Sequence, residues 1–449
     1  MSQTNRIPIL QSDDYLGLKA IPRRLQASPR RIAYGKVAHL VGSLIEVDGL
    51  AAALGDVCRI TPSAGSEPIF AEVVGFNRTR LKLSPLTPLA GICPGDLVCI
   101  SSQTASIEVG RHLLGRVING MGRPIDDLGP LPPGIPYPLA GKILSPLKRP
   151  LIQEQLDLGI RCINSLLPVG KGQRIGIFAG SGVGKSTLLG MIAQYTSAPV
   201  NVIALIGERG REVNEFLEKE LGPEGVKRSV VVVATSDEPA TIRMRATFAA
   251  CSIAEYFRDQ GLDVLLMMDS VTRFAMASRE IGLAAGEPPT TKGYTPSVFA
   301  QLPLLVERAG NFENASITAI YTVLVEGDDM EEPIADTLRS LLDGHIVLDR
   351  ALAQRRHFPA INVLKSVSRL TGRLLKDENK PNAAKFIQTL ANYKNSEDMI
   401  RIGAYVPGSH AETDFAIKMI DKLNAFLCQA VGEACTIKSA YQALAKLFA

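Results

Sequence analysis

A glycine-rich run near the middle of the chain has the residue types and spacing that bind phosphate groups. It reads AGSGVGKST from Ala179 to Thr187 and lies between a strand-like segment, Arg174–Ala179, and a helix-like segment that begins near Ser186. Glycines let backbone N–H groups converge on a phosphate, and the positive end of the following helix adds to the attraction. Lys185 is placed to reach the β and γ oxygens, and the Ser186 hydroxyl suits Mg²⁺. We therefore predict a nucleotide site made of Gly180, Ser181, Gly182, Val183, Gly184, Lys185, Ser186 and Thr187.

Hydrolysis of a bound triphosphate needs three further groups: an acid that holds the metal, a residue that orients water, and a cation near the γ-phosphate. Asp269 ends the apolar run Val264–Asp269 and is the candidate for the metal. Glu208 follows another predicted strand and is the candidate for polarising water, with Arg209 beside it for the γ-phosphate. Arg369 is a further cation. On spacing alone each has an ordinary explanation, such as a strand terminus, a charged surface loop or a solvated arginine.

Positioning these residues requires a sheet, and the sequence after residue 150 predicts one. Apolar runs of strand length alternate there with amphipathic helical stretches, which is typical of a parallel sheet covered on both faces by helices. We place this α/β ATPase domain over residues 151–369. The predicted strands are Arg174–Ala179, Val200–Ile206, Ser229–Ala234, Val264–Asp269, Ile317–Leu324 and Ile346–Leu348.

Three other segments complete the predicted organisation. Short β-type runs broken by Gly, Pro and Asp predict a small antiparallel barrel over residues 35–105. Eight prolines between Pro124 and Pro150 predict a connector over residues 106–150, because proline disfavours helices and central strands. Helical spacing beyond Arg369 predicts a C-terminal helical domain over residues 370–449. The predicted strands of the barrel are Val37–Val47, Val57–Thr61, Ile69–Phe76, Arg80–Leu83 and Asp96–Ile100, and the predicted helices are Asn382–Tyr393, Asp414–Gln429 and Thr436–Phe448.

Composition excludes several classes of protein. The 449 residues are 46% hydrophobic and 21% charged, which indicates a folded protein of two or three domains rather than a disordered or fibrous one. The net charge is 49 − 45 = +4, and residues 1–45 hold seven basic and two acidic side chains, so the remainder sums to −1. A nearly neutral body lacks the basic footprint of a nucleic-acid-binding protein. The basic tail, residues 1–34, is a predicted partner-docking segment, and a solvated tail is the open alternative.

Cysteine usage and hydropathy indicate where the protein works. Seven scattered cysteines without a C-x-x-C pair favour neither a disulfide framework nor a zinc site, and suit a reducing compartment. No run reaches the length of about 18 apolar residues that a membrane span needs, and no signal peptide is evident. The sequence therefore predicts a cytoplasmic protein.

Several motifs together resemble the ATP synthase α/β superfamily of RecA-like hexameric ATPases. The resemblance lies in Arg174–Met191, Ile206–Glu215 and Pro359–Ser368. Longer runs are similar to the flagellar type III export ATPases within that superfamily, and the likeness covers roughly residues 35–435. These runs are Gly207–Val213, Gly286–Tyr294, Pro296–Ala300, Glu326–Asp329 and Leu342–Leu348.

The resemblance implies a role for each candidate residue. Lys185 and Ser186 match the phosphate and magnesium positions, and Asp269 matches the Walker B aspartate. The other matches are Glu208 as the water-activating glutamate, Arg209 as a γ-phosphate contact, Arg273 as a second active-site arginine, Phe358 as the ring that packs on adenine, and Arg369 as the arginine finger offered across a subunit interface.

The same resemblance implies a function. It predicts a homo-hexameric ring that binds ATP and Mg²⁺ and hydrolyses ATP to energise export of flagellar proteins at the cytoplasmic face of the inner membrane. Implied partners are a stator-like regulatory protein at the N-terminus, export-gate and central-stalk proteins, and export substrates and chaperones at the C-terminal helices. The alternatives are an ATPase of a virulence-type injectisome, a non-catalytic ring subunit, which tends to have Gln where this chain has Glu208, and an RNA translocase, which the few N-terminal aromatics disfavour.

Overall fold

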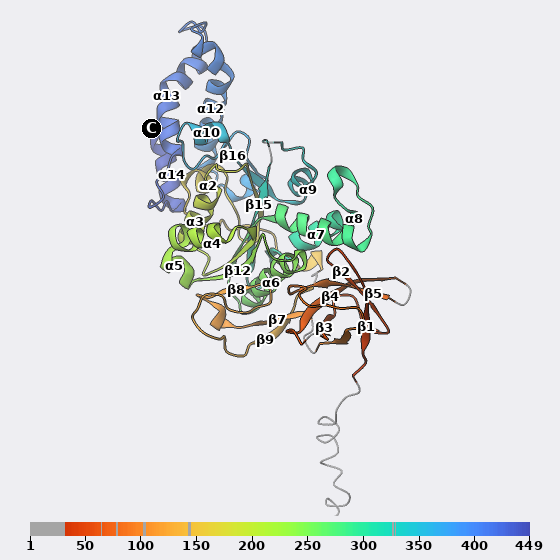
Figure 1. Ribbon diagram of the computed structural model, residues 1–449. Coiled ribbons are helices and arrows are strands. Elements are labelled where there is room, and N and C mark those ends of the chain that lie inside the picture. Colours follow the sequence, from red (N-terminus) through yellow and green to blue (C-terminus); the bar gives the residue numbers. More distant parts are fainter. Residues whose placement is uncertain are drawn as a thin grey trace, which may run out of the picture.

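The computed structural model describes residues 32–449 apart from residue 64, residues 78–79, 102–104 and 142–144, and residues 326 and 328. Figure 1 shows a barrel at one end, a sheet with its helices in the centre, and a group of helices at the opposite end. The predicted fold class, a small barrel followed by a parallel-sheet core and a C-terminal helical part, is confirmed. Most of the predicted docking tail, residues 1–31, lies outside the described residues.

Six short strands close the N-terminal barrel in the order β1-β2-β5-β4-β3-β6. Alternate side chains of these strands point inward and form one small core that includes Ile45, Ile60 and Leu83. The predicted single strand Val37–Val47 was wrong: a turn at Gly42, whose φ of 60° favours glycine, divides it into two paired strands. The strands are β1 (Gly35–Val41), β2 (Leu44–Asp48), β3 (Val57–Thr61), β4 (Ile69–Asn77), β5 (Arg80–Pro85) and β6 (Leu97–Ile100).

Residues 106–150, expected as a connector, contribute strands to the central part. β7 (Ser106–Val109) pairs with β9 (Ile135–Pro138), and β8 (Val117–Asn119) adds to the edge of the large sheet beside β12. The prolines of β9 are tolerated because this strand belongs to a two-stranded sheet with a free edge. Two short 3-10 turns also lie here, η2 (Arg111–Leu113) and η3 (Pro146–Lys148).

The central sheet has nine strands, in the order β17-β16-β10-β15-β13-β11-β12-β8 with β14 paired to β15. All neighbours are parallel except β14 and β17. Each of the six predicted strands is present, two of them with the predicted bounds. The strands are β10 (Arg174–Ala179), β11 (Val200–Glu208), β12 (Ser229–Thr235), β13 (Val264–Asp269), β14 (Gly310–Asn311), β15 (Ser316–Leu324), β16 (Gly344–Leu348) and β17 (Val367–Ser368).

Helices cover both faces of this sheet, as its continuous apolar strands require. On β11, Val202 and Ala204 pack into one core with α6 to α9, whereas Ile203 and Leu205 pack into a second core with α2 and α3. The elements between the strands are α2 (Arg161–Leu166), α3 (Lys185–Tyr195), α4 (Gly210–Glu215), the π-helical turn η4 (Phe216–Leu221), α5 (Gly222–Lys227), α6 (Ala240–Asp259), α7 (Val271–Ala285), η5 (Thr291–Gly293), α8 (Pro296–Val306), α9 (Pro333–Leu341), α10 (Arg350–Gln354) and α11 (Thr371–Leu374).

The C-terminal part is α12 (Lys380–Arg401), α13 (Ala411–Leu427) and α14 (Ile437–Lys446). Phe386 of α12 and Phe426 of α13 pack ring against ring, with centroids 5.2 Å apart. Both belong to the same core as Leu188 of α3, so these helices are continuous with the ATPase domain. In the part of the chain that the structure describes, no helix combines the length and apolar character needed to cross a membrane.

Candidate active site

The phosphate loop connects β10 to α3. Gly182 and Gly184 have φ angles of 75° and 88°, in the left-handed region that favours glycine. Gly184 caps α3, and Lys185 is the first residue of this helix. The loop therefore lies at a helix N-terminus, where free backbone N–H groups and the helix dipole attract anions.

Two neighbouring strands bring carboxylates to Lys185. Glu208 is the last residue of β11 and Asp269 the last residue of β13, and the carboxyl ends of these parallel strands lie at the same edge of the sheet as the loop. The Lys185 ammonium donates a hydrogen bond to Asp269 Oδ1, and its Nζ lies 3.6 Å from Glu208 Oε1. The structure thus brings together three residues, although Lys185 and Asp269 are 84 positions apart in the sequence.

The electrostatics of this trio distinguish its two acids. Burial raises the pKa of Glu208 to about 7, with Lys185 opposing the rise and Asp269 adding to it. Burial also disfavours the charge on Lys185, but Asp269 and Glu208 outweigh that effect and its pKa is raised. Glu208 Oε1 is buried and, among the described residues, accepts no hydrogen bond. A carboxylate with a pKa near neutrality and an oxygen free to accept a hydrogen bond is suited to take or orient a proton of water.

Arginines occupy two different positions near the trio. Arg273, in the first turn of α7, packs against Gly207, where a Cβ atom would lie 2.8 Å from the Arg273 Cβ. Its Nε is buried and makes no hydrogen bond to any residue that the structure describes. Arg209, in contrast, is 82% exposed and lies 3.5 Å from Glu212. Arg273 is therefore part of the floor of the site, while Arg209 projects into solvent.

Lys185, Glu208, Arg209 and Arg273 line one cavity of about 460 Å³, whereas Asp269 and Val183 are buried and are not among its described lining residues. Its polar lining consists of loop residues, strand ends and Arg273, which suits a polyphosphate more than an apolar ligand. The lining includes Gly180, Ser181, Gly182, Gly184, Lys185, Ser186, Thr187, Glu208, Arg209 and Arg273.

Phe358 lies beside the phosphate loop. A Cβ atom on Gly184 would be 3.4 Å from the Phe358 ring, and Phe358 as a residue is 43% exposed. Its backbone carbonyl accepts a hydrogen bond from Gln429 at 3.0 Å, which ties it to the segment after α13. An exposed aromatic face next to a phosphate site is a surface on which a base can stack.

Arg369 lies apart from this cavity. It follows the edge strand β17, is exposed, and its Nη2 donates to the backbone carbonyl of Arg339 at 3.0 Å. Of the predicted catalytic residues, the structure brings Lys185, Glu208, Asp269 and Arg273 together and leaves Arg369 outside. One chain therefore presents two separate features, a phosphate cavity and an exposed arginine.

The chain is similar to known proteins. The nucleotide-binding domain of the ATP synthase alpha/beta family matches residues 159–368, and the T3SS EscN ATPase C-terminal domain matches residues 375–446. The "Flagellum-specific ATP synthase" of Bacillus subtilis is 55% identical over 416 residues, covering 92% of this chain and 95% of the relative. The chain belongs to the flagellum-specific ATP synthase family.

Proteins of secretion systems are also similar to this member of the family. A "Type 3 secretion system ATPase" of Xanthomonas euvesicatoria is 48% identical over 396 residues, which is 88% of this chain and 90% of the relative. The assembled ATPase EscN of enteropathogenic E. coli gives a TM-score of 0.87 at 45% identity and covers 92% of this chain and 100% of that one. EscN has also been solved with its central stalk EscO. Membership of the ATP synthase alpha/beta family makes this chain an ATPase with a nucleotide substrate.

The oxygen atoms at the site suit Mg²⁺ that is bound together with a nucleotide. Asp269, Glu208 and the Ser186 hydroxyl offer hard oxygen donors, and among the described residues Glu208 Oε1 accepts no hydrogen bond. Among the described residues there is no cluster of three or more His, Cys, Asp or Glu that would hold a metal unaided. Mg²⁺ commonly takes one or two protein carboxylates and completes its shell with phosphates and water. The residues present fit that pattern.

Sequence reasoning missed Thr322. It lies on β15, next to β13, and its Oγ1 donates to Asp269 Oδ1 at 2.7 Å. Asp269 is thereby held between Thr322 and Lys185. In the sequence, Thr322 stands out only as a hydroxyl residue within the largely apolar run Ile317–Leu324. It is fully buried in the structure, and only the strand order shows which acid it contacts.

Proposed function

We propose that this chain hydrolyses ATP at the subunit interfaces of a homo-hexameric ring and thereby energises export of flagellar proteins through a type III export apparatus. The ring would work at the cytoplasmic face of the inner membrane. Support comes from the flagellum-specific relatives and from the assembled state of EscN, whose fold this chain shares at a TM-score of 0.87.

The observation that carries the proposal is the separation of two functional groups within one chain. Glu208 lies in the phosphate cavity, whereas Arg369 is exposed outside it. A ring of identical subunits would therefore form a complete site at each interface, with Glu208 from one chain and Arg369 from the next. An arginine supplied in this way typically accelerates phosphoryl transfer by about 10³- to 10⁵-fold.

The phosphate loop and the residues around it have separate roles in this proposal. Backbone N–H groups of the loop and Lys185 bind the phosphates, and Glu208 accepts a proton from the attacking water. Ser186 and Asp269 would hold Mg²⁺, which neutralises charge on the phosphates when bound. Arg273 and Arg209 contribute positive charge near the γ-phosphate, and the Phe358 ring packs on adenine.

Partners follow from the same proposal. Residues 1–34 dock a stator-like regulatory protein, a central stalk like the EscO that binds EscN enters the ring, and export-gate proteins receive the cargo. Substrates and chaperones contact the C-terminal helices, which lie at the end of the molecule opposite the barrel (Figure 1). The chain divides for these purposes into the tail, a barrel over 35–105, a linking segment over 106–150, the ATPase domain over 151–369 and the helical part over 370–449.

An injectisome ATPase is the second candidate function. It is favoured by the 48% identity to the Xanthomonas protein and by the match of residues 375–446 to the EscN C-terminal domain. The 55% identity to the Bacillus flagellum-specific protein favours the flagellar system.

Genetic complementation distinguishes the two systems. The gene is expressed in one strain that lacks its flagellar ATPase and in another that lacks its injectisome ATPase, with the Glu208→Gln variant as the matched control for expression without hydrolysis. We expect swimming to return in the first strain with the natural chain and not with the variant. Restored needle secretion without swimming would assign the chain to the injectisome.

A further inference from the structure

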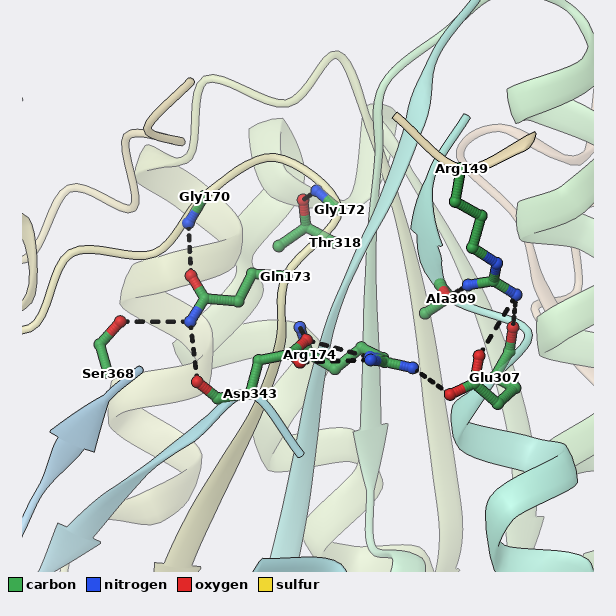
Figure 2. A network of polar contacts seen from close by, with 10 residues as sticks. All are labelled: Arg149, Gly170, Gly172, Gln173, Arg174, Glu307, Ala309, Thr318, Asp343 and Ser368. Atoms are coloured by element: carbon green, nitrogen blue, oxygen red, sulfur yellow. Dashed lines mark hydrogen bonds and ion pairs between the residues drawn. The ribbon is translucent and has the colours of Figure 1, made fainter. Parts of the chain in front are cut away.

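A buried polar network joins the strand that carries the phosphate loop to the residue that precedes Arg369 (Figure 2). Its centre is Gln173, which is fully buried and lies immediately before β10. The Gln173 side-chain carbonyl accepts a hydrogen bond from the Gly170 N–H at 2.7 Å, which fixes the orientation of the amide. The amide nitrogen donates to the Asp343 carbonyl at 3.1 Å and to Ser368 Oγ at 3.2 Å.

Both acceptors hold the backbone of Arg369. Ser368 is its neighbour in sequence, and the Ser368 hydroxyl also donates to the Pro168 carbonyl at 2.6 Å. The Arg369 N–H donates at 3.0 Å to the same Asp343 carbonyl that Gln173 contacts. The Gln173 side-chain amide therefore holds both the residue before Arg369 and the carbonyl that binds the Arg369 N–H.

Arg174 restrains Asp343 from the other direction. Its backbone N–H and Nε each donate to Asp343 Oδ2 at 3.0 Å, and its Nη2 donates to Oδ1 at 3.2 Å. Its remaining Nη1 contacts Glu307 at 2.6 Å. Two-pronged pairs between guanidinium and carboxylate are directional as well as strong, so they fix Asp343 relative to β10.

Among the described residues, the Arg369 side chain has no comparable support. Its guanidinium is exposed and donates to the Arg339 carbonyl at 3.0 Å. Where the guanidinium can reach is therefore set by the backbone from which it extends.

From this geometry we propose that Gln173 is a positioning residue for hydrolysis in the neighbouring subunit, because it holds the Asp343–Ser368 corner from which Arg369 extends. The inference rests on the proposed function, in which Arg369 completes the next subunit's site. In this proposal β10 contributes to two sites. The strand ends in the phosphate loop of its own subunit's site, and it begins next to Gln173, which positions the Arg369 that serves the neighbouring subunit's site.

Gln173→Leu tests the proposal because it keeps the approximate size and removes both donors. Thr318→Val is the matched control: Thr318 is similarly buried and accepts a hydrogen bond from the Gly172 N–H at 2.8 Å, and Figure 2 draws no hydrogen bond from it to Asp343 or Ser368. In single-turnover hydrolysis by assembled rings, we expect Gln173→Leu to be slower by about 100-fold, the typical cost of displacing a catalytic group by about 1 Å. ATP affinity should be unchanged, and Thr318→Val should stay within a few-fold of the natural chain.

Rescue by a second chain separates positioning from a merely structural role. Gln173→Leu chains are mixed with an excess of Glu208→Gln chains, which have an intact Arg369 but a defective cavity. We expect the single-turnover rate per Gln173→Leu chain to recover most of its loss, because its intact cavity is now served by a well-placed arginine. Mixing with Glu208→Gln/Arg369→Ala chains should give no recovery. Absence of rescue by Glu208→Gln chains would overturn the positioning role.

Two further measurements keep the outcome unambiguous. Arg369→Ala chains mixed with Glu208→Gln chains test the proposed function itself. If the hydrolysis rate of this mixture is not restored, the interfacial site is wrong. If it is restored while the rate of Gln173→Leu chains is not, only the role of Gln173 is rejected. Should Gln173→Leu fail to fold, Ser368→Ala removes the second anchor of the same corner and is tested in the same mixtures. The same pattern of rescue is expected, and its absence rejects the proposal.

Discussion

Glu208 lies where its negative charge is disfavoured, and this shapes both its chemistry and the stability of the fold. Burial and the nearby Asp269 raise its pKa to about 7 in spite of Lys185. At neutral pH a substantial fraction of Glu208 is therefore ready to accept a proton, which is the condition under which a general base is most effective.

Replacing Glu208 by Gln should leave nucleotide binding nearly intact and slow hydrolysis by about 10²- to 10⁴-fold, the usual contribution of a general base. In the natural chain, kcat/KM should fall as the pH drops below about 7, because the carboxylate becomes protonated. A fast Gln variant, or a natural enzyme whose rate is flat between about pH 6 and pH 8, would assign the role to another residue.

The same pKa predicts that the Glu208→Gln variant is more stable than the natural chain at high pH. The unfolded glutamate ionises near the ordinary value of 4.5 and the folded one at about 7, so ionisation destabilises the fold progressively between these values and fully above them. Without nucleotide, Glu208→Gln should therefore raise the thermal midpoint relative to the natural chain above pH 7. The difference should shrink toward about pH 5. A difference that does not widen with pH would contradict this environment for Glu208.

Phe358 offers a test of the nucleotide base. Removing its ring by Phe358→Ala should weaken ATP binding by about 1–3 kcal/mol, the usual value of a stacking contact between an aromatic ring and a base. Phe358→Tyr keeps the ring and should bind ATP normally. Calorimetric titration measures both, and unchanged affinity in the Ala variant would place adenine elsewhere.

At the scale of elements, long apolar strands were predictable and short ones were not. β10 and β13 have the predicted bounds because their runs are apolar on both faces and end at glycine- or acid-containing loops. β8 and β17 have only three and two residues, too few for any periodicity, and they exist because a partner strand is already in place.

The same distinction applies to the site. The phosphate loop, Glu208 and Asp269 are marked by local patterns at strand ends, so sequence reasoning named them. Thr322 and Gln173 act through strands that are far away in sequence, and their partners depend on which strands lie side by side. Strand order is a property of the whole sheet, and no local pattern encodes it.

The C-terminal helices yield a prediction about packing. Phe386 is fully buried between α12 and α13, so Phe386→Ala should destabilise this part by about 3–5 kcal/mol, the range for removing a buried ring. Phe415 of α13 is 39% exposed, and Phe415→Ala should cost less than about 1 kcal/mol. Thermal unfolding followed by circular dichroism compares the two, and an equal loss in both variants would contradict the packing described.

At the scale of the whole molecule, the proposed function requires two chains for each catalytic site. One chain contains the phosphate cavity, and its Arg369 is exposed on a different part of the chain. An isolated subunit should therefore bind ATP and hydrolyse it poorly, and assembly should switch hydrolysis on.

The most direct test is specific activity measured over a dilution series, with the mass of the particles determined at each concentration. We expect the activity per chain to rise together with the appearance of rings, and Arg369→Ala to assemble equally well yet remain about 10³-fold or more slower. Activity per chain that stays constant down to the monomer, together with normal turnover by Arg369→Ala, would contradict a site shared between two subunits.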